Sequence, residues 1–410
     1  MNTPVRTTLV ELTRRTVRHA VDGTVPLADE VMQVQAATYY DPERWRQEVD
    51  RIFRRSPLVL GFTAELREPG SYKAVEVAGI PVLLVRSANG AARAFVNMCS
   101  HRGAMVVEPG TSGSARRFTC PYHAWSYDTS GHLVGVLDRS SFGDIDESCA
   151  GFTTLPCEER AGLIFVGLTP GAALDLDAFL CGYDTVLEYL HLDRCNYVGS
   201  QSADGPNWKV AYDGYLDFYH LPILHKATFG PSFCNKAIYD AWGPHQRVSA
   251  PDDRIARLAS KDESTWTDDH LTMGVWTVFP HVSIAPFLVG AEGVEGGGRM
   301  YLVSTLFPGP DPDTSVTVQH FLADFEVTPE LAPLVEAQRR FLLHVVREED
   351  YLTGNRIQMA LKTGAKPDVL FGRNELGNQR FHAWVERLVQ AESPDDFAAT
   401  IRGGTVEFQP

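Results

Sequence analysis

Two short pairs of metal-binding residues constrain the fold of this chain more than any other feature. Cys99 and His101 form the first pair, Cys120 and His123 form the second, and eighteen residues separate the two pairs. Each pair offers one thiolate and one imidazole, whereas common zinc sites group two Cys on one loop and two His on one helix. This mixture suits a two-iron cluster in which two His replace two Cys on one iron. The stretch therefore predicts an electron-transfer centre, with a zinc site as the alternative.

The residues around the two pairs are typical of tight turns and of an apolar wall. Gly103 follows the first pair, Pro121 lies inside the second, and Trp125 and Tyr127 come directly after it. With these residues the stretch resembles the Rieske domain of the Rieske non-haem iron oxygenases, in particular the large subunit of aromatic-ring-hydroxylating enzymes. The resemblance implies that both pairs hold a [2Fe–2S] cluster. Ala124 stands where relatives usually carry Gly, and we expect this change to leave ligation intact.

Length and charge narrow the class of protein. The chain has 410 residues and a formal net charge of -15, which argues for two domains and against nucleic acid or an anionic membrane as partners. No apolar run reaches the ~18 residues of a membrane span, and the basic N-terminus lacks the features of a signal peptide. We expect a cytoplasmic protein in which the five other Cys residues are buried free thiols.

A pair of His residues about a hundred positions later indicates a second metal site. His220 and His225 are five residues apart, which on a regular helix would point them roughly 140° apart. Pro222 lies between them and cannot donate a helical hydrogen bond, so we expect a break there that lets the rings converge. Two His residues then need a carboxylate to form the facial triad that leaves open positions on Fe(II) for O2.

The long helical pattern near the C-terminus offers that carboxylate. Asp350 continues the apolar row of Leu342 and Val346 at helical spacing, so it is predicted to face inward, where metal ligation would offset the cost of burying it. Glu349 is the second candidate for the third ligand position.

The resemblance to the oxygenase family extends over most of residues 41–385. The matching patterns are Asn-Trp-Lys at 207–209, Asp-x-x-His-x4-His at 217–225 and Glu-Asp-x7-Gln at 349–358. The resemblance implies that His220, His225 and Asp350 bind a mononuclear iron and that Asn207 lies near it. It also implies that Asp217 bridges an iron-ligand His to a cluster His of the next subunit, which predicts a homotrimer, with or without a small beta subunit.

The order of the expected elements predicts an α+β fold. Residues 1–56 are predicted to form N-terminal helices that pack on the catalytic domain, residues 57–168 an all-β Rieske domain, and residues 169–410 the catalytic domain. In the catalytic domain, strands at 272–279, 282–289, 299–307 and 315–323 precede a long helix at 331–362. This order indicates an antiparallel sheet wrapped on a long C-terminal helix, the helix-grip or START-like arrangement.

The function expected from these sites is that of a terminal oxygenase. No Gly-rich dinucleotide fingerprint follows a strand, so NAD(P)H is expected to act through a separate reductase, directly or through a ferredoxin. Aromatic and aliphatic residues flank the second site and favour an apolar, aromatic substrate. We expect cis-dihydroxylation ahead of monohydroxylation or oxidative demethylation. The alternatives from other classes are a Rieske electron carrier and a zinc-containing β module fused to a binding domain.

Overall fold

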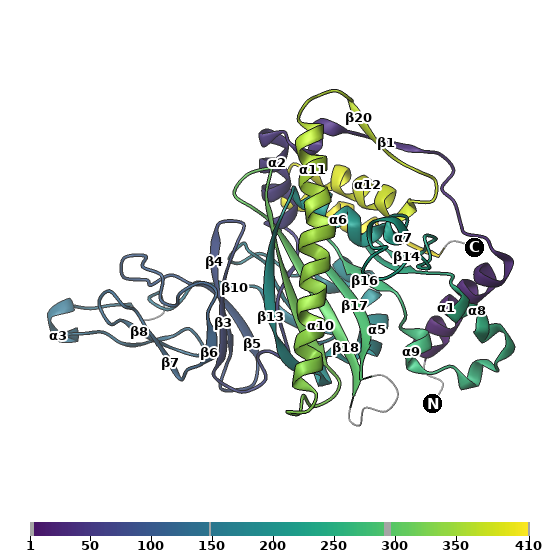
Figure 1. Cartoon of the computed structure of the whole chain (residues 1–410). Helices are drawn as coiled ribbons and strands as arrows, with labels where there is room; N and C mark the ends of the chain where they lie inside the picture. The colour runs from purple at the N-terminus through teal and green to yellow at the C-terminus, as the bar shows by residue number, and fades with distance from the viewer. Residues whose placement is uncertain (1–3, 147–148, 291–296, 409–410) are drawn as a thin grey trace. The chain divides into compact units, whose positions relative to one another are not determined.

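The structure is a computed structural model that describes residues 4–146, 149–290 and 297–408. The chain divides into two units (Figure 1). Residues 53–176 and 191–194 form the smaller unit, and the N-terminal segment to Ile52, residues 177–190 and the chain from Cys195 onward form the larger one. None of the helices among the described residues combines the length and the hydropathy needed to cross a bilayer.

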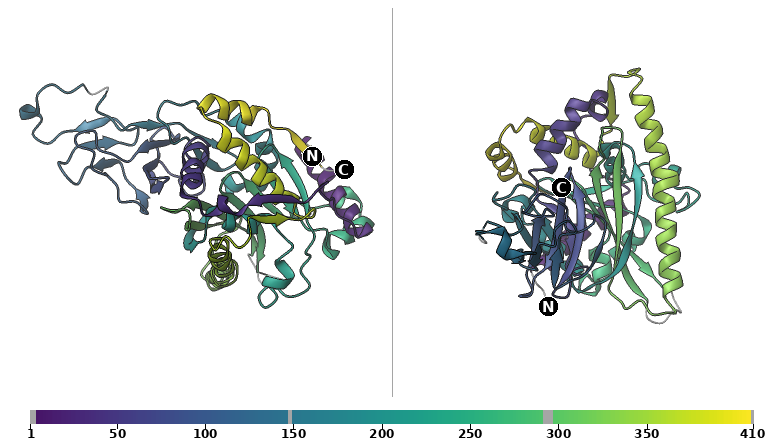
Figure 2. Two further views of the ribbon diagram at one scale, coloured as in Figure 1. Left: turned by 90° about the horizontal axis from the view of Figure 1, so that it is seen from above. Right: turned by 90° about the vertical axis from the view of Figure 1, so that its left-hand side faces the viewer.

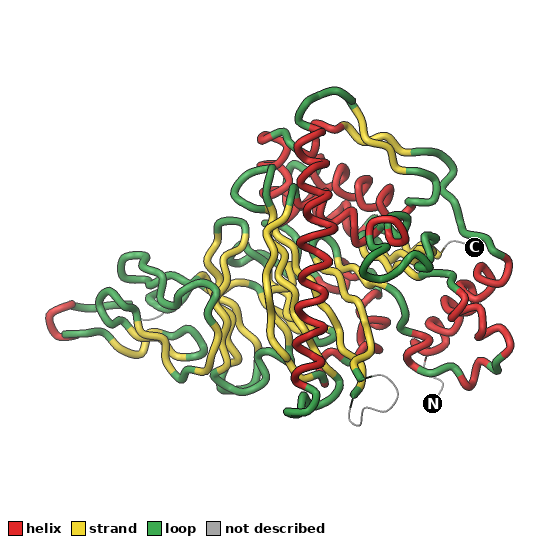
Figure 3. The backbone as a smooth tube through the Cα atoms, viewed as in Figure 1, coloured by secondary structure: helices red, strands yellow, loops and turns green. Residues whose placement is uncertain are grey.

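The smaller unit consists of short antiparallel strands joined by long loops (Figure 3). Its largest sheet has the order β10-β5-β4-β3-β6, with β3 at Ser71–Val77, β4 at Ile80–Arg86, β5 at Ala92–Val96, β6 at Ser112–Ser114 and β10 at Thr154–Leu155. A second sheet contains β2 (Leu58–Phe62), β11 (Cys157–Arg160) and β12 (Leu163–Val166), and a third contains β7 (Arg117–Thr119), β8 (Ser126–Asp128) and β9 (Leu133–Gly135). The all-β prediction is confirmed. The sequence predicts strands at 72–77, 81–86 and 92–97, and β3, β4 and β5 begin and end within one residue of these positions.

The larger unit is organised around one antiparallel sheet of eight strands, in the order β13-β19-β18-β17-β16-β15-β14-β21. The strands are β13 (Asn196–Gly205), β14 (Ile238–Trp242), β15 (His245–Ser249), β16 (Val275–Val278), β17 (Val282–Val289), β18 (Gly298–Pro308), β19 (Ser315–Ala323) and β21 (Val406–Phe408). β17 and β19 have the predicted bounds. The Gly-rich sequence at 290–298 predicts a flexible hairpin connection. Most of it, residues 291–296, lies outside the described residues.

A long helical segment runs along one face of this sheet, as Figures 1 and 2 show. It comprises α10 (Ala332–His344), a π-helical stretch at Val345–Tyr351 and α11 (Leu352–Leu361). Val335 and Leu342 of α10 pack on Met300 and Phe321 of the sheet. Burial of this apolar contact holds the helix on the sheet, and the predicted α+β class with a sheet wrapped on a long helix is confirmed.

Further helices complete the larger unit. They are α1 (Pro4–Asp22), α2 (Pro42–Glu48), α4 (Leu176–Leu180), α5 (Tyr183–Leu187), α6 (Trp208–Leu216), α7 (Leu221–Leu224), α12 (Leu376–Gln390) and α13 (Pro394–Arg402). Asp41 caps α2 as its sequence predicts, since its carboxylate accepts the N–H groups of Glu43 and Arg44 at 2.7 and 3.1 Å. The sequence predicts a single helix at 179–190. The structure interrupts it, because Cys181 and Gly182 adopt left-handed backbone angles between α4 and α5.

Candidate metal centres

The two Cys/His pairs lie on loops with the same backbone turn. We call residues 99–104 and 120–125 the cluster loops. In each loop the N–H of the Cys donates to the carbonyl of the residue five positions later at 2.8 Å, and the N–H of the residue four positions later donates to the Cys carbonyl. That fourth residue has a left-handed φ in both loops: +78° at Gly103 and +59° at Ala124. The sequence prediction of two tight ligand turns is confirmed by these hydrogen bonds.

The side chains of the cluster loops converge. Cys99 and Cys120 are buried, and the ring centroids of His101 and His123 are 4.7 Å apart. The Nδ1 atom of His101 is buried without a hydrogen-bond partner among the described residues. A buried imidazole nitrogen without a partner, near two buried thiols and a second imidazole, fits the donor set of a [2Fe–2S] cluster with two Cys and two His ligands.

Two aromatic residues support the first cluster loop. The Trp125 ring stacks on His101, with centroids 5.0 Å apart and an interplanar angle of 10°. The Tyr127 hydroxyl lies 3.1 Å from Cys99 Sγ and accepts the Ser100 N–H at 3.0 Å. A hydrogen bond to a cluster sulfur is one of the factors that set the potential of such a cluster, so Tyr127 does more than form the apolar wall predicted for it.

The second centre is assembled from His220, His225 and Asp350. One ligand atom from each lies within 4.8 Å of the others, and no other set of three such residues is so placed in the part of the chain that the structure describes. Asp350 Oδ1 is 3.2 Å from His225 Nε2 and 3.8 Å from His220 Nε2. We call these residues the metal triad. Two imidazoles and one carboxylate on one side of an ion match the facial arrangement typical of non-haem Fe(II) sites.

The chain brings the two His rings together by a route that differs from the predicted one. Helix α6 ends at Leu216, and Asp217 is extended, with φ −107° and ψ 118°. His220 and His225 then stand at the N-terminal and C-terminal caps of the one-turn helix α7, and Pro222 lies in its first turn. The expected break at Pro222 is therefore wrong: proline is tolerated in a first turn, and the chain departs from helical geometry upstream, at Asp217.

Asp350 lies in the π-helical stretch rather than in a regular α-helix. The regular spacing that placed it in the row of Leu342 and Val346 therefore does not hold at this point. Its side chain is 27 % exposed, whereas Val346 is buried. Single π turns inside α-helices are frequent at functional sites, and here the wider turn places Asp350 against both His rings.

Two further carboxylates lie next to the Nδ1 atoms of the two His residues of the metal triad. Asp217 Oδ2 is 3.0 Å from His220 Nδ1, and Glu349 Oε2 is 2.7 Å from His225 Nδ1. Burial alone would lower the pKa of His225, but the hydrogen bonds and charges of Asp350 and Glu349 outweigh it and raise the pKa. Glu349, the second candidate for the third ligand, thus lies behind His225 and outside the metal triad.

Asn207 holds the start of α6 in place. Its Oδ1 accepts the Lys209 N–H at 2.9 Å as the N-cap of α6, and its Nδ2 donates to the Pro312 carbonyl at 2.7 Å. Both ends of this buried amide are therefore engaged with the backbone. That Asn207 lies near the iron stays a prediction.

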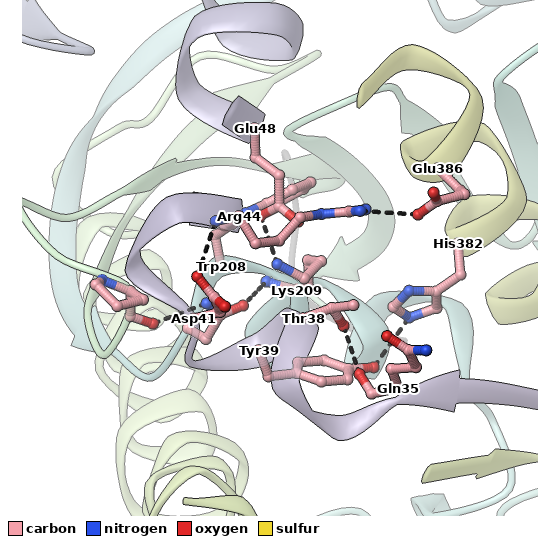
Figure 4. A network of polar contacts seen from close by, with 12 residues as sticks. Gln35, Thr38, Tyr39, Asp41, Arg44, Glu48, Trp208, Lys209, His382 and Glu386 are labelled. Carbon is pink, nitrogen blue, oxygen red and sulfur yellow. Dashed lines mark hydrogen bonds and ion pairs between the residues drawn. The ribbon is translucent and has the colours of Figure 1, made fainter. Parts of the chain in front are cut away.

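A buried ion pair anchors the start of α6 (Figure 4). Lys209 Nζ is 2.5 Å from Glu48 Oε2, which also accepts the Trp208 indole N–H at 2.8 Å, and Arg44 Nε donates to Glu48 Oε1 at 2.9 Å. Glu48 and Lys209 are 0 and 1 % exposed. Burial lowers the pKa of Lys209, while the Glu48 carboxylate opposes that shift. The Asn-Trp-Lys motif therefore fixes α6, and with it the segment that leads to the metal triad.

A second group of polar contacts holds Asp213, a residue in the middle of α6; its members Tyr39 and His382 are labelled in Figure 4. The Tyr39 hydroxyl donates to Asp213 Oδ2 at 3.0 Å, and His382 Nε2 lies 2.9 Å from Asp213 Oδ1. Sequence reasoning gave Asp213 no role and did not single out Glu48 or Thr228. A signal was present for Glu48, because it lies three residues after Trp45 on the apolar stripe of its helix, where a lone carboxylate would need a buried partner.

Two family models match the chain. Residues 56–143 match "Rieske [2Fe-2S] domain", and residues 192–391 match "Ring hydroxylating alpha subunit (catalytic domain)". The chain is 30 % identical to the chlorobenzene dioxygenase alpha subunit of Cupriavidus sp. over 299 residues, which cover 62 % of this chain and 65 % of that protein. It is 26 % identical over 345 residues to the carnitine monooxygenase oxygenase subunit of Acinetobacter pittii, covering 79 and 84 % of the two chains.

The fold is also that of a solved oxygenase. The naphthalene 1,2-dioxygenase from Rhodococcus sp. superimposes with a TM-score of 0.69 at 22 % identity, covering 94 % of this chain and 99 % of the other. The matched stretch spans less than two thirds of the chlorobenzene dioxygenase subunit. The curated relatives include proteins named for aromatic substrates and others named for carnitine or glycine betaine.

Proposed function

We propose that this chain, whose segments match a Rieske [2Fe-2S] domain and the catalytic domain of ring-hydroxylating alpha subunits, is a terminal oxygenase with O2 as co-substrate. The observation that carries this proposal is the convergence of His220, His225 and Asp350 within 4.8 Å. Fe(II) bound by this triad would keep open positions at which O2 is activated beside a substrate. An electron carrier would need the cluster loops alone, so the metal triad distinguishes the two functions.

The chain's own residues divide the work between the two centres. Cys99, His101, Cys120 and His123 would hold the [2Fe–2S] cluster, which receives electrons from a separate reductase or ferredoxin. Asp217 fixes the His220 ring through Nδ1 and is itself 20 % exposed. A partly exposed carboxylate next to a ligand ring can accept a second N–H from outside the chain. We therefore propose that Asp217 bridges to a cluster His of another copy in a homotrimer.

The substrate proposed is apolar and aromatic, with cis-dihydroxylation as the favoured reaction. A group of three Phe rings lies next to His225. The centroid of the Phe229 ring is 5.2 Å from that of His225, 5.4 Å from that of Phe233 and 5.6 Å from that of Phe341. Such rings provide an apolar wall against which an aromatic compound packs. The same rings could face a quaternary ammonium group, so oxidative demethylation of such a cation is the second candidate, in line with the carnitine-named relative.

The test combines metal analysis with turnover on two substrate classes. The purified chain should contain acid-labile sulfide, and after dithionite reduction it should show the EPR signal of a Rieske cluster, with additional mononuclear iron. With a suitable reductase and ferredoxin, naphthalene should yield a cis-diol that carries both atoms of ¹⁸O2, while L-carnitine should give no product. Product from carnitine alone would establish the second candidate. Zinc without sulfide would overturn the proposal.

A further inference from the structure

Glu349 and Asp350 hold the two nitrogens of a single imidazole ring. Asp350 Oδ1 lies 3.2 Å from Nε2 of His225, and Glu349 Oε2 lies 2.7 Å from Nδ1 of the same ring. Consecutive residues of an α-helix point about 100° apart, which makes such a pair unusual. Here both carboxylates come from the π-helical stretch, whose wider turn brings neighbouring residues toward the same side.

The Glu349 carboxylate has a further fixed partner. Thr228 Oγ1 donates to the same Oε2 atom at 2.8 Å, and Thr228 belongs to the turn that follows His225. The Glu349 side chain is 15 % exposed and the His225 ring 3 %, whereas Asp217 and His220 are each 20 % exposed. Glu349 therefore lies on the more protected side of the triad, and it connects the turn after His225 to the long helical segment.

We propose that Glu349, held by Thr228, is a positioning residue that fixes the tautomer and the orientation of His225 for iron. When Nδ1–H donates to Glu349, the lone pair of Nε2 is directed toward Asp350 and the metal. A carboxylate on the distal nitrogen also makes an imidazole a stronger ligand. This inference rests on the proposed iron site, and it gives Glu349 a different role from Asp217, whose exposure suits contact with another chain.

A purely structural role would have a different signature. If Glu349 only connected two segments, its loss would lower the stability of the metal-free protein and leave metal binding in the folded state unchanged. If it positions His225, its loss would weaken metal binding in a protein of unchanged stability. Glu349→Gln keeps the size of the side chain and removes its charge, so it separates the two roles better than truncation does.

The experiment measures Fe(II) affinity by competition with a chromophoric chelator, on the full chain freed of its mononuclear metal. Glu349→Gln should bind Fe(II) about 10–100-fold more weakly, and Thr228→Val should show a smaller loss in the same direction. Glu348→Gln is the matched control, because Glu348 is an exposed neighbour on the same helix, and it should bind as the wild type does. With Co(II) in the site, the visible spectrum should differ from that of the wild type in Glu349→Gln and should be unchanged in Glu348→Gln.

Three results would overturn the inference. Wild-type affinity and an unchanged Co(II) spectrum in Glu349→Gln would refute it and leave the proposed function intact. A fall in the melting temperature of the metal-free variant, with unchanged Fe(II) affinity, would assign Glu349 a structural role only. A wild-type chain that binds neither Fe(II) nor Co(II) would overturn the proposed function together with this inference.

Discussion

The two metal centres of this chain are built in opposite ways. The four Cys and His residues of the cluster loops come from one stretch of 25 residues, from Cys99 to His123, and hydrogen bonds within each loop fix its turn. The metal triad instead needs α7 and the π-helical stretch, and His225 and Glu349 are 124 residues apart in the sequence. The first centre therefore depends on local turn geometry and the second on packing in the larger unit. Changes to one should leave the other intact.

His225→Ala should have the largest effect and should separate the centres completely. The variant loses an imidazole ligand, so we expect the iron content to fall by about one atom per chain and turnover to be abolished. Sulfide content and the Rieske EPR signal should not change, since no cluster ligand is altered. Loss of sulfide in this variant would show that the two centres are not independent.

Glu48→Gln tests whether the metal triad depends on remote packing. Removing one partner of a buried ion pair leaves the other charge uncompensated, which typically costs about 3–5 kcal/mol. We expect the free energy of unfolding of the larger unit to fall by about 3 kcal/mol in urea titrations, because the glutamine can still accept hydrogen bonds from Lys209 and Trp208. Glu43→Gln, in an exposed pair with Arg46, should change it by less than about 0.5 kcal/mol.

Asp217→Asn tests the proposed contact between the metal triad and the cluster of another subunit. Both metals should remain bound and the cluster should still be reduced by dithionite, since neither ligand set changes. Turnover should fall about 10–100-fold, the usual cost of losing a carboxylate partner of a ligand His. Oxygen uptake during substrate turnover measures this loss. Full activity in the variant would contradict the bridging role proposed for Asp217.

The difference between the centres also explains what sequence could predict. The cluster loops were predictable because each ligand pair lies inside its own turn, and the long strands β17 and β19 show their period directly. The path between Asp217 and His225 was not predictable, because the position of α6 depends on residues such as Glu48 that lie far away in sequence. Strands β14 and β15 were not predicted, because polar residues interrupt their apolar pattern: Asp240 and Arg247 are buried as an ion pair in adjacent strands, 2.7 Å apart.

Ala124→Gly should have the smallest effect and should be confined to the cluster loops. Ala124 occupies the position that Gly103 holds in the other loop, with φ +59°. An L-residue in this conformation costs about 1–2 kcal/mol, and glycine gives back about 0.5–1 kcal/mol through chain entropy. We expect a net gain of about 0.5–1 kcal/mol in the stability of the smaller unit. Urea unfolding, monitored by the loss of cluster absorbance, measures this gain.

Gly103→Ala should change that stability by a similar amount in the opposite direction. A Cβ at this position would meet no atom closer than Met98 Sδ at 3.9 Å, so the loss would come from the backbone conformation and not from a steric clash. Opposite signs for the two variants would show that the loops are the same turn with different residues at one position. Equal signs would mean that the cluster, and not the turn, determines the conformation of these loops.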